Sequence, residues 1–429
     1  RVAIINKHSG PNLFQGSAPF LVDFNKKTMT IAVNTLKAMI LFRFKFSLFL
    51  LLGITSGLLS AQEIERGIRL RSSEVSLRYL EYEHAVSLDA SGVPKMNWKQ
   101  YHSRPEKVIT RKVPSKIIEN KWFRATVIPS MGRVHSFVHM PSGREQLWIN
   151  PVAVPLGANN DAGFWMTWGG IEHVMPRREH GTSHALSWEW KLVENDGGTV
   201  GIRMSSVEPV TGLSHQITYQ ANEKQPFMEV CIRITNPGKE SVRFSHWTTS
   251  TLAPGGQGDV TAKTEIIVPA ERFVPDDRDF NTWMTGMVGP VATAPIRFVG
   301  AWKDIGDLMA SPLKQGYYAV FSHEIGDGLV RTFPLEVTPG FDIWGWGYPP
   351  SEQRQKEYTR AFPSLGYIEI WNGNVHGFKD HSLATLKPGE VNEWTERIAA
   401  IHVKGSDQLI RNEIRQLAES MVSPPLTLH

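Results

Sequence analysis

The residues best suited to chemistry lie in the segment WGGIEHVMPRREHGTSHALSWEW, which runs from Trp168 to Trp190. The titratable or charged side chains that lie among its aromatic ones include Glu172, His173, Arg177, His180 and His184. Imidazoles exchange protons near neutral pH, and flat aromatic faces offer an apolar surface for a sugar ring. The segment therefore predicts a sugar-facing loop in which these five residues bind the substrate.

A metal site is a competing interpretation of this loop, and a solvated loop without chemistry is another. Its histidines are separated by seven and then four residues. This spacing matches no compact zinc signature. We therefore predict a site that uses neither a metal nor another cofactor.

The second chemical candidate is His246, which follows a strand-like stretch in SVRFSHWTTSTLAPGG and precedes Trp247. An imidazole at the end of a strand, beside an indole, is placed to deliver a proton to a stacked ring. We predict that His246 is catalytic and that Trp247 binds the substrate. A histidine that is only hydrogen-bonded at the edge of a sheet is the alternative.

The third candidate is Glu369 in the apolar stretch LGYIEIWNGNVHGF. In a strand, alternation places Tyr367, Glu369 and Trp371 on one face. A carboxylate between two aromatic neighbours is partly desolvated, which raises its pKa toward that of a usable base. We predict that Glu369 is catalytic and that Trp371 binds the substrate. An outward, solvated glutamate is the alternative.

A fourth stretch, GFDIWGWGYPP, is rich in aromatic residues and glycine. Trp344 and Trp346 alternate in it and can therefore share one face of a strand. We predict that both form a platform on which a sugar ring stacks. Packing between two sheets is the alternative interpretation.

Short alternating segments make up most of the chain and predict the scaffold that positions these residues. They are rich in β-branched and aromatic residues and are bounded by Gly, Pro, Asn and Asp, as expected for strands. Examples lie at 123–129, 199–207, 215–221, 227–235, 264–270, 317–323 and 367–371. The one convincing helix is predicted at 407–419, with an apolar stripe of Leu409, Ile410, Ile414 and Leu417.

The beginning of the chain has the order of a secretory signal peptide at 39–61. Arg43 and Lys45 precede an apolar run, and small residues lead to Ala61. We predict cleavage after Ala61, residues 1–38 as an upstream extension, and a periplasmic or secreted bacterial protein. A membrane anchor is the alternative, but the apolar run is short for a span of about 20 residues.

Removal of residues 1–61 changes the charge of the protein. Seven of the 46 Lys and Arg residues and one of the 42 Asp and Glu residues lie in that segment, which leaves a mature chain of net charge about −2. The basic isoelectric point therefore belongs to the removed segment, and nothing favours nucleic acid as a partner. The single cysteine, Cys231, permits no intramolecular disulfide.

The order of these motifs resembles the galactose mutarotase-like superfamily, which includes the aldose 1-epimerases. The shared order is SMGRVHSF and SGREQLW, then GGI, MP, HG and WEW, then TNPGKESVRFSH, YIEIW and LKPGEVNEWTERI. The stretches HWTTSTLAPGG, PGFDIWGWG and YIEIWNG resemble most closely a bacterial subfamily known only as a domain of unknown function. The resemblance covers roughly residues 121–403.

This resemblance implies an all-β fold, a β-supersandwich of two broad antiparallel sheets that holds a sugar in a groove on one face. We place it at 62–403, with a short C-terminal helix and tail at 404–429. By the same resemblance, His246 protonates the ring oxygen, Glu369 takes the anomeric proton, and His180 binds the ring. Arg133 or Arg177 would hold hydroxyls or a carboxylate. The sequence departs from true epimerases after His246, where Trp-Thr-Thr follows.

The predicted function is acid–base chemistry on a sugar ring, with His246 and Glu369 facing each other across a groove. Anomer interconversion needs one group to remove the O1 proton and another to protonate O5. The alternatives are β-elimination on uronic-acid oligosaccharides, by a lyase or dehydratase, and a non-catalytic glycan-binding module. The expected partner is a mono- or oligosaccharide, without nucleic acid and without a membrane span after signal removal. The oligomeric state stays open.

Overall fold

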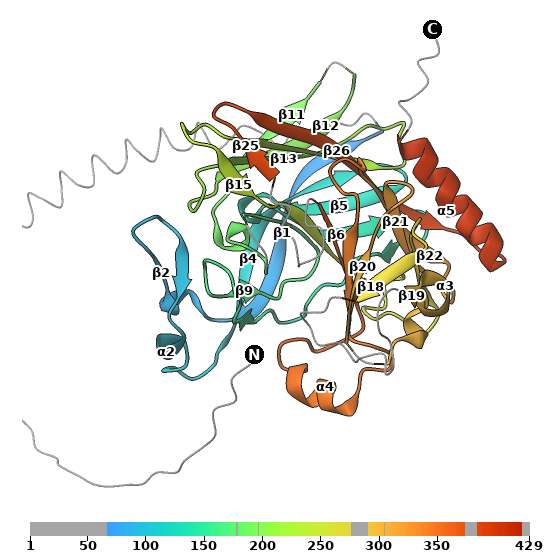
Figure 1. The fold of residues 1–429 in the computed structure, drawn as a ribbon, viewed down its shortest axis with the longest axis horizontal. Coiled ribbons are helices and arrows are strands. Elements are labelled where there is room, and N and C mark those ends of the chain that lie inside the picture. Colours follow the sequence, from blue (N-terminus) through green and yellow to red (C-terminus); the bar gives the residue numbers. More distant parts are fainter. Residues whose placement is uncertain are drawn as a thin grey trace, which may run out of the picture. The chain divides into compact units, whose positions relative to one another are not determined.

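The computed structural model describes residues 67–422 except 177–178, 196, 276–290, 304 and 374–383. The described residues belong to one compact unit, which Figure 1 shows as a ribbon. The predicted upstream extension at 1–38 and the signal peptide at 39–61 lie outside the described residues.

The larger of two sheets has twelve strands in the order β1-β4-β5-β6-β10-β16-β24-β23-β20-β18-β19, with β7 beside β6. Its strands are β1 (Arg69–Leu80), β4 (Val108–Glu119), β5 (Phe123–Ile128), β6 (Arg133–His139), β7 (Arg144–Glu145), β10 (Ile171–Val174), β16 (Trp247–Leu252), β18 (Arg272–Pro275), β19 (Val291–Ala292), β20 (Gly306–Ala310), β23 (Phe341–Gly345) and β24 (Ile368–Gly373). Neighbouring strands are antiparallel throughout this sheet.

The smaller sheet has eight antiparallel strands in the order β11-β12-β13-β14-β26-β22-β21-β17. Its strands are β11 (Glu189–Glu194), β12 (Val200–Val207), β13 (Ser214–Ala221), β14 (Met228–Thr235), β17 (Thr264–Ile267), β21 (Tyr317–Ser322), β22 (Asp327–Thr332) and β26 (Val391–His402). The strands predicted at 215–221, 227–235 and 317–323 correspond to β13, β14 and β21.

The core lies between the inner faces of the two sheets. Ile118 and Phe137 of the larger sheet and Ile202 and Ile232 of the smaller one belong to a single buried cluster. Side chains alternate along each strand, so one face of each sheet supplies this cluster and the other face is left for other contacts. Each fully buried side chain of this size contributes about 1.5–3 kcal/mol. The predicted β-supersandwich is confirmed.

Short elements connect the strands of the two sheets. Three small pairs are β2 (Val86–Leu88) with β3 (Pro94–Met96), β8 (Pro155–Leu156) with β9 (Trp165–Met166), and β15 (Val242–Phe244) with β25 (Ala384–Leu386). The short helices are α2 (Trp98–Tyr101), α3 (Thr293–Ile296) and α4 (Glu352–Tyr358), with 3-10 turns η1 (Glu83–Ala85), η2 (Pro129–Met131), η3 (Ser183–Ala185) and η5 (Val299–Ala301). In the described part of the chain, no helix has the length and apolar character that crossing a membrane requires.

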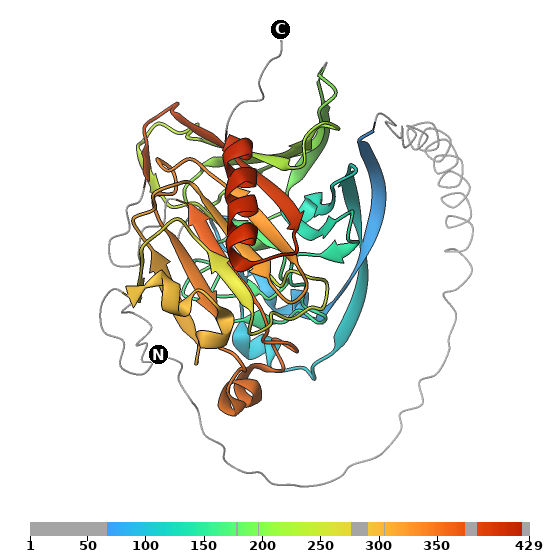
Figure 2. The ribbon, with the colours of Figure 1, turned by 90° about the vertical axis from the view of Figure 1, so that its right-hand side faces the viewer.

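The predicted C-terminal helix is confirmed as α5 (Asp407–Val422), which packs on the outside of the smaller sheet (Figures 1 and 2). Its buried residues are Ile410, Ile414, Ala418 and Met421. Leu409 is 44% exposed, so the predicted stripe is wrong at that position. Residues at i, i+4, i+8 and i+11 lie on one side of a helix, and this row excludes Leu409.

Candidate active site

Strand β24 turns Glu369 and Trp371 away from the core. Ile368 and Ile370 belong to the buried core cluster, and Asn372 also points inward and donates to Glu396. Glu369 and Trp371 instead line a pocket on the outer face of the larger sheet, together with Tyr367, which precedes β24 and also packs in that cluster. The alternation predicted from the sequence for these residues is confirmed.

Neighbouring strands extend this outer face into a row of polar and aromatic residues. Glu369 lies opposite Trp344 of β23, and Trp371 lies opposite Thr249 of β16. Thr249 in turn lies opposite Glu172 of β10. Because directly opposite residues in a sheet share a face, two carboxylates from strands far apart in the sequence reach the same surface.

A pocket of about 230 Å³ opens over this row. Its aromatic lining consists of Trp165, Trp344, Trp346, Tyr358, Phe362, Tyr367 and Trp371. Glu179, His180 and Glu369 supply its titratable groups. Flat apolar walls with a few convergent polar groups are typical of small-molecule sites.

A buried pair of Glu172 and His180 lies beside Glu369. Nδ1 of His180 lies 2.7 Å from Oε1 of Glu172. The imidazole stacks on the Trp165 indole with a centroid separation of 3.8 Å and an interplanar angle of 4°. Glu172, His180 and Glu369 also line a small cavity together. The hydrogen bond and the stack fix the position of the ring on two sides.

An unusual turn carries the imidazole back over the sheet. His180 has a φ of 64° and Glu179 a φ of 51°, in the left-handed region that residues other than glycine seldom adopt. A Cβ on the next residue, Gly181, would lie 1.9 Å from the carbonyl oxygen of Met175. The His-Gly pair of the sequence therefore has a steric cause, since only glycine fits against that carbonyl.

Arg133, at the start of β6, completes the polar floor. Its Nη1 donates to Oε2 of Glu172 at 3.2 Å, and its Nη2 donates to the carbonyl oxygen of Gly169. Gly170 has a φ of 77°, and a Cβ there would lie 2.4 Å from the carbonyl oxygen of Val134. The Gly-Gly pair thus lets β10 approach β6 closely enough for Arg133 to reach Glu172.

These contacts set different protonation states for the three central groups. Burial favours the neutral carboxyl of Glu172, but the hydrogen bond from His180 and the charges of His180 and Arg133 lower its pKa to about 2. Burial also disfavours the imidazolium of His180, yet the hydrogen bond and charge of Glu172 raise its pKa above the usual value. Burial raises the pKa of Glu369, which the charge of His180 partly opposes.

The pocket therefore places an imidazole of raised pKa, hydrogen-bonded to the Glu172 carboxylate, beside a carboxyl whose pKa is also raised. The indole N–H of Trp371 donates to Oε1 of Glu369 and orients the carboxylate. A positioned acid and a positioned base in one pocket can give and take protons on a bound hydroxylated ring. The predicted role of Glu369 stays consistent with this geometry.

The predicted pairing of His246 with Glu369 is wrong. His246 shares the parity of Thr248, whose hydroxyl lies 3.4 Å from Nδ1 of His173 inside the sandwich. The rings of His173 and His246 are 5.6 Å apart. Glu369 lies opposite Thr251 on the outer face. Successive side chains alternate between faces, so the sheet itself separates the two groups.

The other predicted substrate-binding residues divide between three places. Those that line the pocket or its floor are Glu172, His180, Trp344, Trp346 and Trp371. His173 does not, because it points inward and its Nε2 lies 2.8 Å from the hydroxyl of Tyr219. The metal alternative for the 173/180/184 loop is therefore wrong as well, since His173 and His180 lie on opposite faces.

Two further predicted residues lie near the pocket without lining it. Trp247 is 1% exposed and packs with Val174 and Trp371 on the outer face. His184 lines a neighbouring pocket of about 360 Å³ together with Trp168. Arg177 lies outside the described residues.

Sequence reasoning missed several residues of the aromatic wall. Trp165 lies three residues before the segment that was singled out, in GFWMTWGG, so its aromatic neighbours were an available signal. Tyr358 ends α4, and Phe362 follows it. Their place in the pocket depends on ring contacts with residues far away in the sequence or beyond the next turn, of Tyr358 with Trp346 and of Phe362 with Trp346 and Tyr367. No local pattern reveals these contacts.

Residues 89–397 match the model of the family described as Domain of unknown function (DUF5107). The chain belongs to this family. The prediction of a family known only as a domain of unknown function is thereby confirmed. No curated protein matches the sequence.

Several solved structures are similar to this DUF5107 chain. A TPR-domain containing protein from Parabacteroides distasonis shows 16% identity and a TM-score of 0.65, over 86% of this chain and 59% of that one. A putative aldose 1-epimerase from Klebsiella pneumoniae subsp. pneumoniae shows 13% identity and a TM-score of 0.49, over 82% and 96%. A galactose mutarotase-like protein from Clostridium acetobutylicum shows 13% identity and a TM-score of 0.48, over 68% and 96%. The chain thus spans less than two thirds of the Parabacteroides protein, and that likeness concerns the fold alone.

Proposed function

We propose that this DUF5107 chain is a carbohydrate-active enzyme that moves protons on a sugar ring, as in the interconversion of the anomers of a free aldose. The observation that carries the proposal is the presence of Glu369 and the Glu172–His180 pair in one aromatic pocket. Glu369 removes the proton of the anomeric hydroxyl, and the His180 imidazolium protonates the ring oxygen. Ring closure returns both protons. His180 thus takes the role that the sequence assigned to His246.

The protonation states support this division of roles. A base is most effective when its pKa lies near the working pH, and burial moves the pKa of Glu369 in that direction. An acid must carry its proton, and Glu172 raises the pKa of His180. Each such group contributes about 10²–10⁴-fold to a rate. Glu172 itself acts as a positioning residue, because it holds the imidazolium without having to reach the sugar.

The charges of the pocket favour a neutral sugar over a uronic acid. β-Elimination needs a positive group that stabilises the enolate of the uronate. Arg133 is 4% exposed and already donates to Glu172 and to a backbone carbonyl. Among the described residues, the side chains with a carboxyl, imidazole or basic group that line the pocket are His180, Glu179 and Glu369. β-Elimination on uronic-acid oligosaccharides and sugar binding without turnover are the two alternatives that the experiment below distinguishes.

The test is proton NMR exchange spectroscopy, which measures how fast the two anomers of a free aldose interconvert in the presence of the purified protein. Glucose, galactose, mannose and xylose are examined for accelerated exchange between their anomeric signals. We expect the protein to accelerate anomer exchange of at least one of these sugars, and we expect the Glu369→Gln variant to lose this acceleration. Formation of unsaturated products from uronic-acid oligosaccharides would replace the proposal with elimination. Sugar binding that leaves every anomeric exchange rate unchanged would replace it with a binding module.

Export remains a second, separate proposal, supported by the signal-like order at 39–61. N-terminal sequencing of the mature protein from the native bacterium tests it. We expect a first residue near Gln62 in the periplasmic or secreted fraction. A protein that begins at Met29 or earlier would contradict it.

A further inference from the structure

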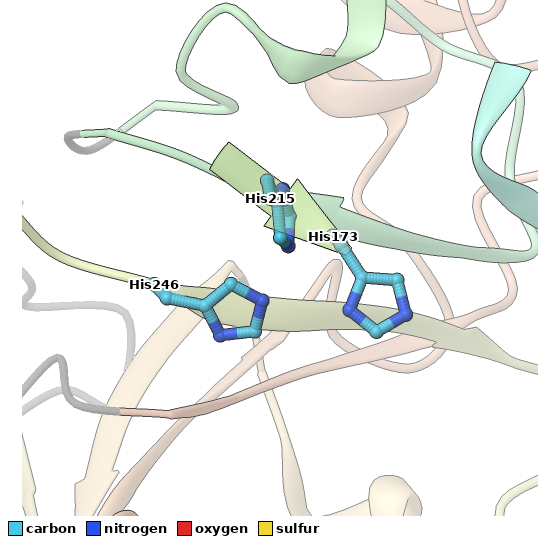
Figure 3. A group of neighbouring side chains, drawn as sticks. All are labelled: His173, His215 and His246. Carbon is cyan, nitrogen blue, oxygen red and sulfur yellow. The ribbon is translucent and has the colours of Figure 1, made fainter. Parts of the chain in front are cut away.

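Three histidines meet between the two sheets, on the face of the larger sheet opposite to the pocket. His173 lies on β10, His246 directly precedes β16, and His215 lies on β13 of the smaller sheet. Nitrogen atoms of the three rings lie within 4.8 Å of one another. Figure 3 shows the rings converging, with that of His215 seen edge-on. The cluster therefore joins both sheets.

Burial keeps this cluster away from solvent and uncharged. The three side chains are 3%, 1% and 1% exposed for His173, His215 and His246. Burial lowers the pKa of His215 to about 3 and holds those of the other two well below their usual value. Neutral imidazole is the form that binds metals. The cluster is thus already in the ligating form at neutral pH.

Neighbouring groups hold the rings in place. The hydroxyl of Tyr219 lies 2.8 Å from Nε2 of His173. In metal-ligating histidines, such a hydrogen bond at one ring nitrogen fixes the tautomer and leaves the other nitrogen for the metal. Indole rings pack edge-on against the other two imidazoles, Trp188 against His215 and Trp394 against His246, each with centroids 5.1 Å apart. The three imidazoles are therefore held from several sides.

One ring nitrogen of the cluster lacks a hydrogen-bond partner in the part of the chain that the structure describes. Nε2 of His215 is buried and accepts or donates no hydrogen bond within the described residues. Buried polar atoms in native proteins are nearly always paired with protein, water or an ion. An apolar side chain of similar size would avoid this cost at the position of His215. The unpaired nitrogen therefore points to a partner that the described side chains do not supply.

The nearby positive charge of Arg331 does not prevent a cation from binding. Its guanidinium lowers the pKa of His173 and His246 after the larger effect of burial. It is itself paired with Glu396, with Nη2 2.6 Å and Nε 2.7 Å from the same carboxylate oxygen. The ion pair is neutral as a whole, so the cluster faces a dipole rather than a bare positive charge.

We propose that His173, His215 and His246 bind one divalent transition-metal ion that cross-links the two sheets. Three neutral imidazoles suit Zn²⁺, Cu²⁺, Ni²⁺ or Fe²⁺, whereas Ca²⁺ and Mg²⁺ require oxygen ligands. With Zn–N distances of about 2.0–2.1 Å, the ligand nitrogens lie about 3.3 Å apart, a contraction of at most about 1.5 Å from the observed cluster. The burial of all three rings makes the ion structural, since no sugar in the outer pocket can reach it.

The first test is the metal content of the unaltered full chain, which needs no variant. Protein purified without a histidine tag is analysed by inductively coupled plasma mass spectrometry, then stripped with a chelator and incubated with ZnCl₂. We expect close to one Zn²⁺ per chain after dialysis. A hundredfold excess of Zn²⁺ over its Kd should raise the thermal midpoint by about 5 °C. Metal-free protein that takes up no stoichiometric Zn²⁺, Cu²⁺, Ni²⁺ or Fe²⁺ overturns the proposal.

The second test locates the ion. His215→Gln and His173→Gln should each lower Zn²⁺ affinity at least tenfold and remove the Zn²⁺-dependent rise of the midpoint. His102→Gln, which changes an exposed histidine on the surface, is the matched control and should bind like the unaltered chain. Uptake of Zn²⁺ that is unchanged in both cluster variants would contradict the site. Because Glu369→Gln leaves these histidines intact, its Zn²⁺ uptake separates this proposal from the proposed function.

Discussion

The two faces of the larger sheet use histidine in opposite ways, although the residues come from the same strands or the loops next to them. On the outer face, Glu172 raises the pKa of His180. On the inner face, burial lowers the pKa of His173 and His246, and the neighbouring histidines and Arg331 add to this effect. Adjacent residues of β10, Glu172 and His173, belong to these two environments. A shift of one residue along a strand thus decides whether a side chain belongs to the pocket or to the buried histidine cluster.

The pocket lies on the outer face of the larger sheet because, in the part of the chain that the structure describes, only that face is open. The inner face is closed by the smaller sheet, so every group there must be satisfied by protein or by an ion. Among the described residues, the β8–β9 pair, loops and α4 line the pocket on the outer face and leave it open. Titratable groups can therefore accumulate on the outer face without interrupting the core.

The largest expected effect is that of Glu369→Gln. Removal of one general base should lower turnover of the responsive aldose by about 10²–10⁴-fold while sugar binding persists. The measurement is anomer exchange at saturating sugar, with affinity checked by calorimetry. Glu393→Gln, which changes a half-exposed glutamate on β26, is the control. Turnover that survives Glu369→Gln would move the base elsewhere.

Glu172→Gln should come next, through stability as well as activity. The substitution leaves the buried charge of Arg133 without an anionic partner, and breaking a buried pair costs about 3–5 kcal/mol. Urea unfolding measures this loss. Replacing Arg133 with Met in the same chain should recover part of it, because the unpaired charge is gone. A loss below about 1 kcal/mol in Glu172→Gln would show that the pair does not stabilise the protein.

The pH profile of kcat/KM should be bell-shaped. Activity rises as Glu369 ionises, with a midpoint above its usual 4.5 because its pKa is raised. Activity falls about tenfold per pH unit as His180 loses its proton, with a midpoint above the usual 6.5. The stability that His180 gains from Glu172 has the same sign, since it is present at low pH and lost as the pH rises through the raised pKa. An alkaline limb unchanged in Glu172→Gln would contradict this assignment.

Trp344→Ala should have the smallest effect of the four. Loss of one stacking face removes about 1.5 kcal/mol of binding, which raises KM about tenfold and leaves kcat close to its original value. Trp190→Ala, which changes a 42% exposed indole on β11, should alter neither constant. A fall in kcat without a change in KM would show that Trp344 supports the fold of the pocket instead.

The fold was readable from the sequence because strand alternation is a local property. The stretch YIEIW showed which residues of β24 share a face, and QLIRNEIRQLAES showed the helix. The face of the sheet on which His246 lies could not be predicted in the same way. All six residues of β16 are buried, because this central strand is covered on both faces, so its alternation does not distinguish core from pocket.

Contacts between the sheets were equally hidden. The sequence indicates only that His215 lies in a strand, because the two histidines close to it lie 42 and 31 residues away in the sequence. The left-handed turn at His180 and the cover provided by α4 are likewise products of tertiary packing. Sequence patterns therefore predicted the residue types of the site, but not which face each one occupies.

The most direct test of the account compares the same substitution on the two faces, His180→Asn and His246→Asn. Anomer exchange is measured for both variants with the aldose on which the unaltered chain acts, together with their unfolding midpoints. We expect His180→Asn to lose at least about 10²-fold in turnover, while His246→Asn keeps its turnover within about threefold and loses about 1–3 kcal/mol of stability. Loss of turnover in a folded His246→Asn, with His180→Asn still active, would contradict the placement of the reactive histidine on the outer face.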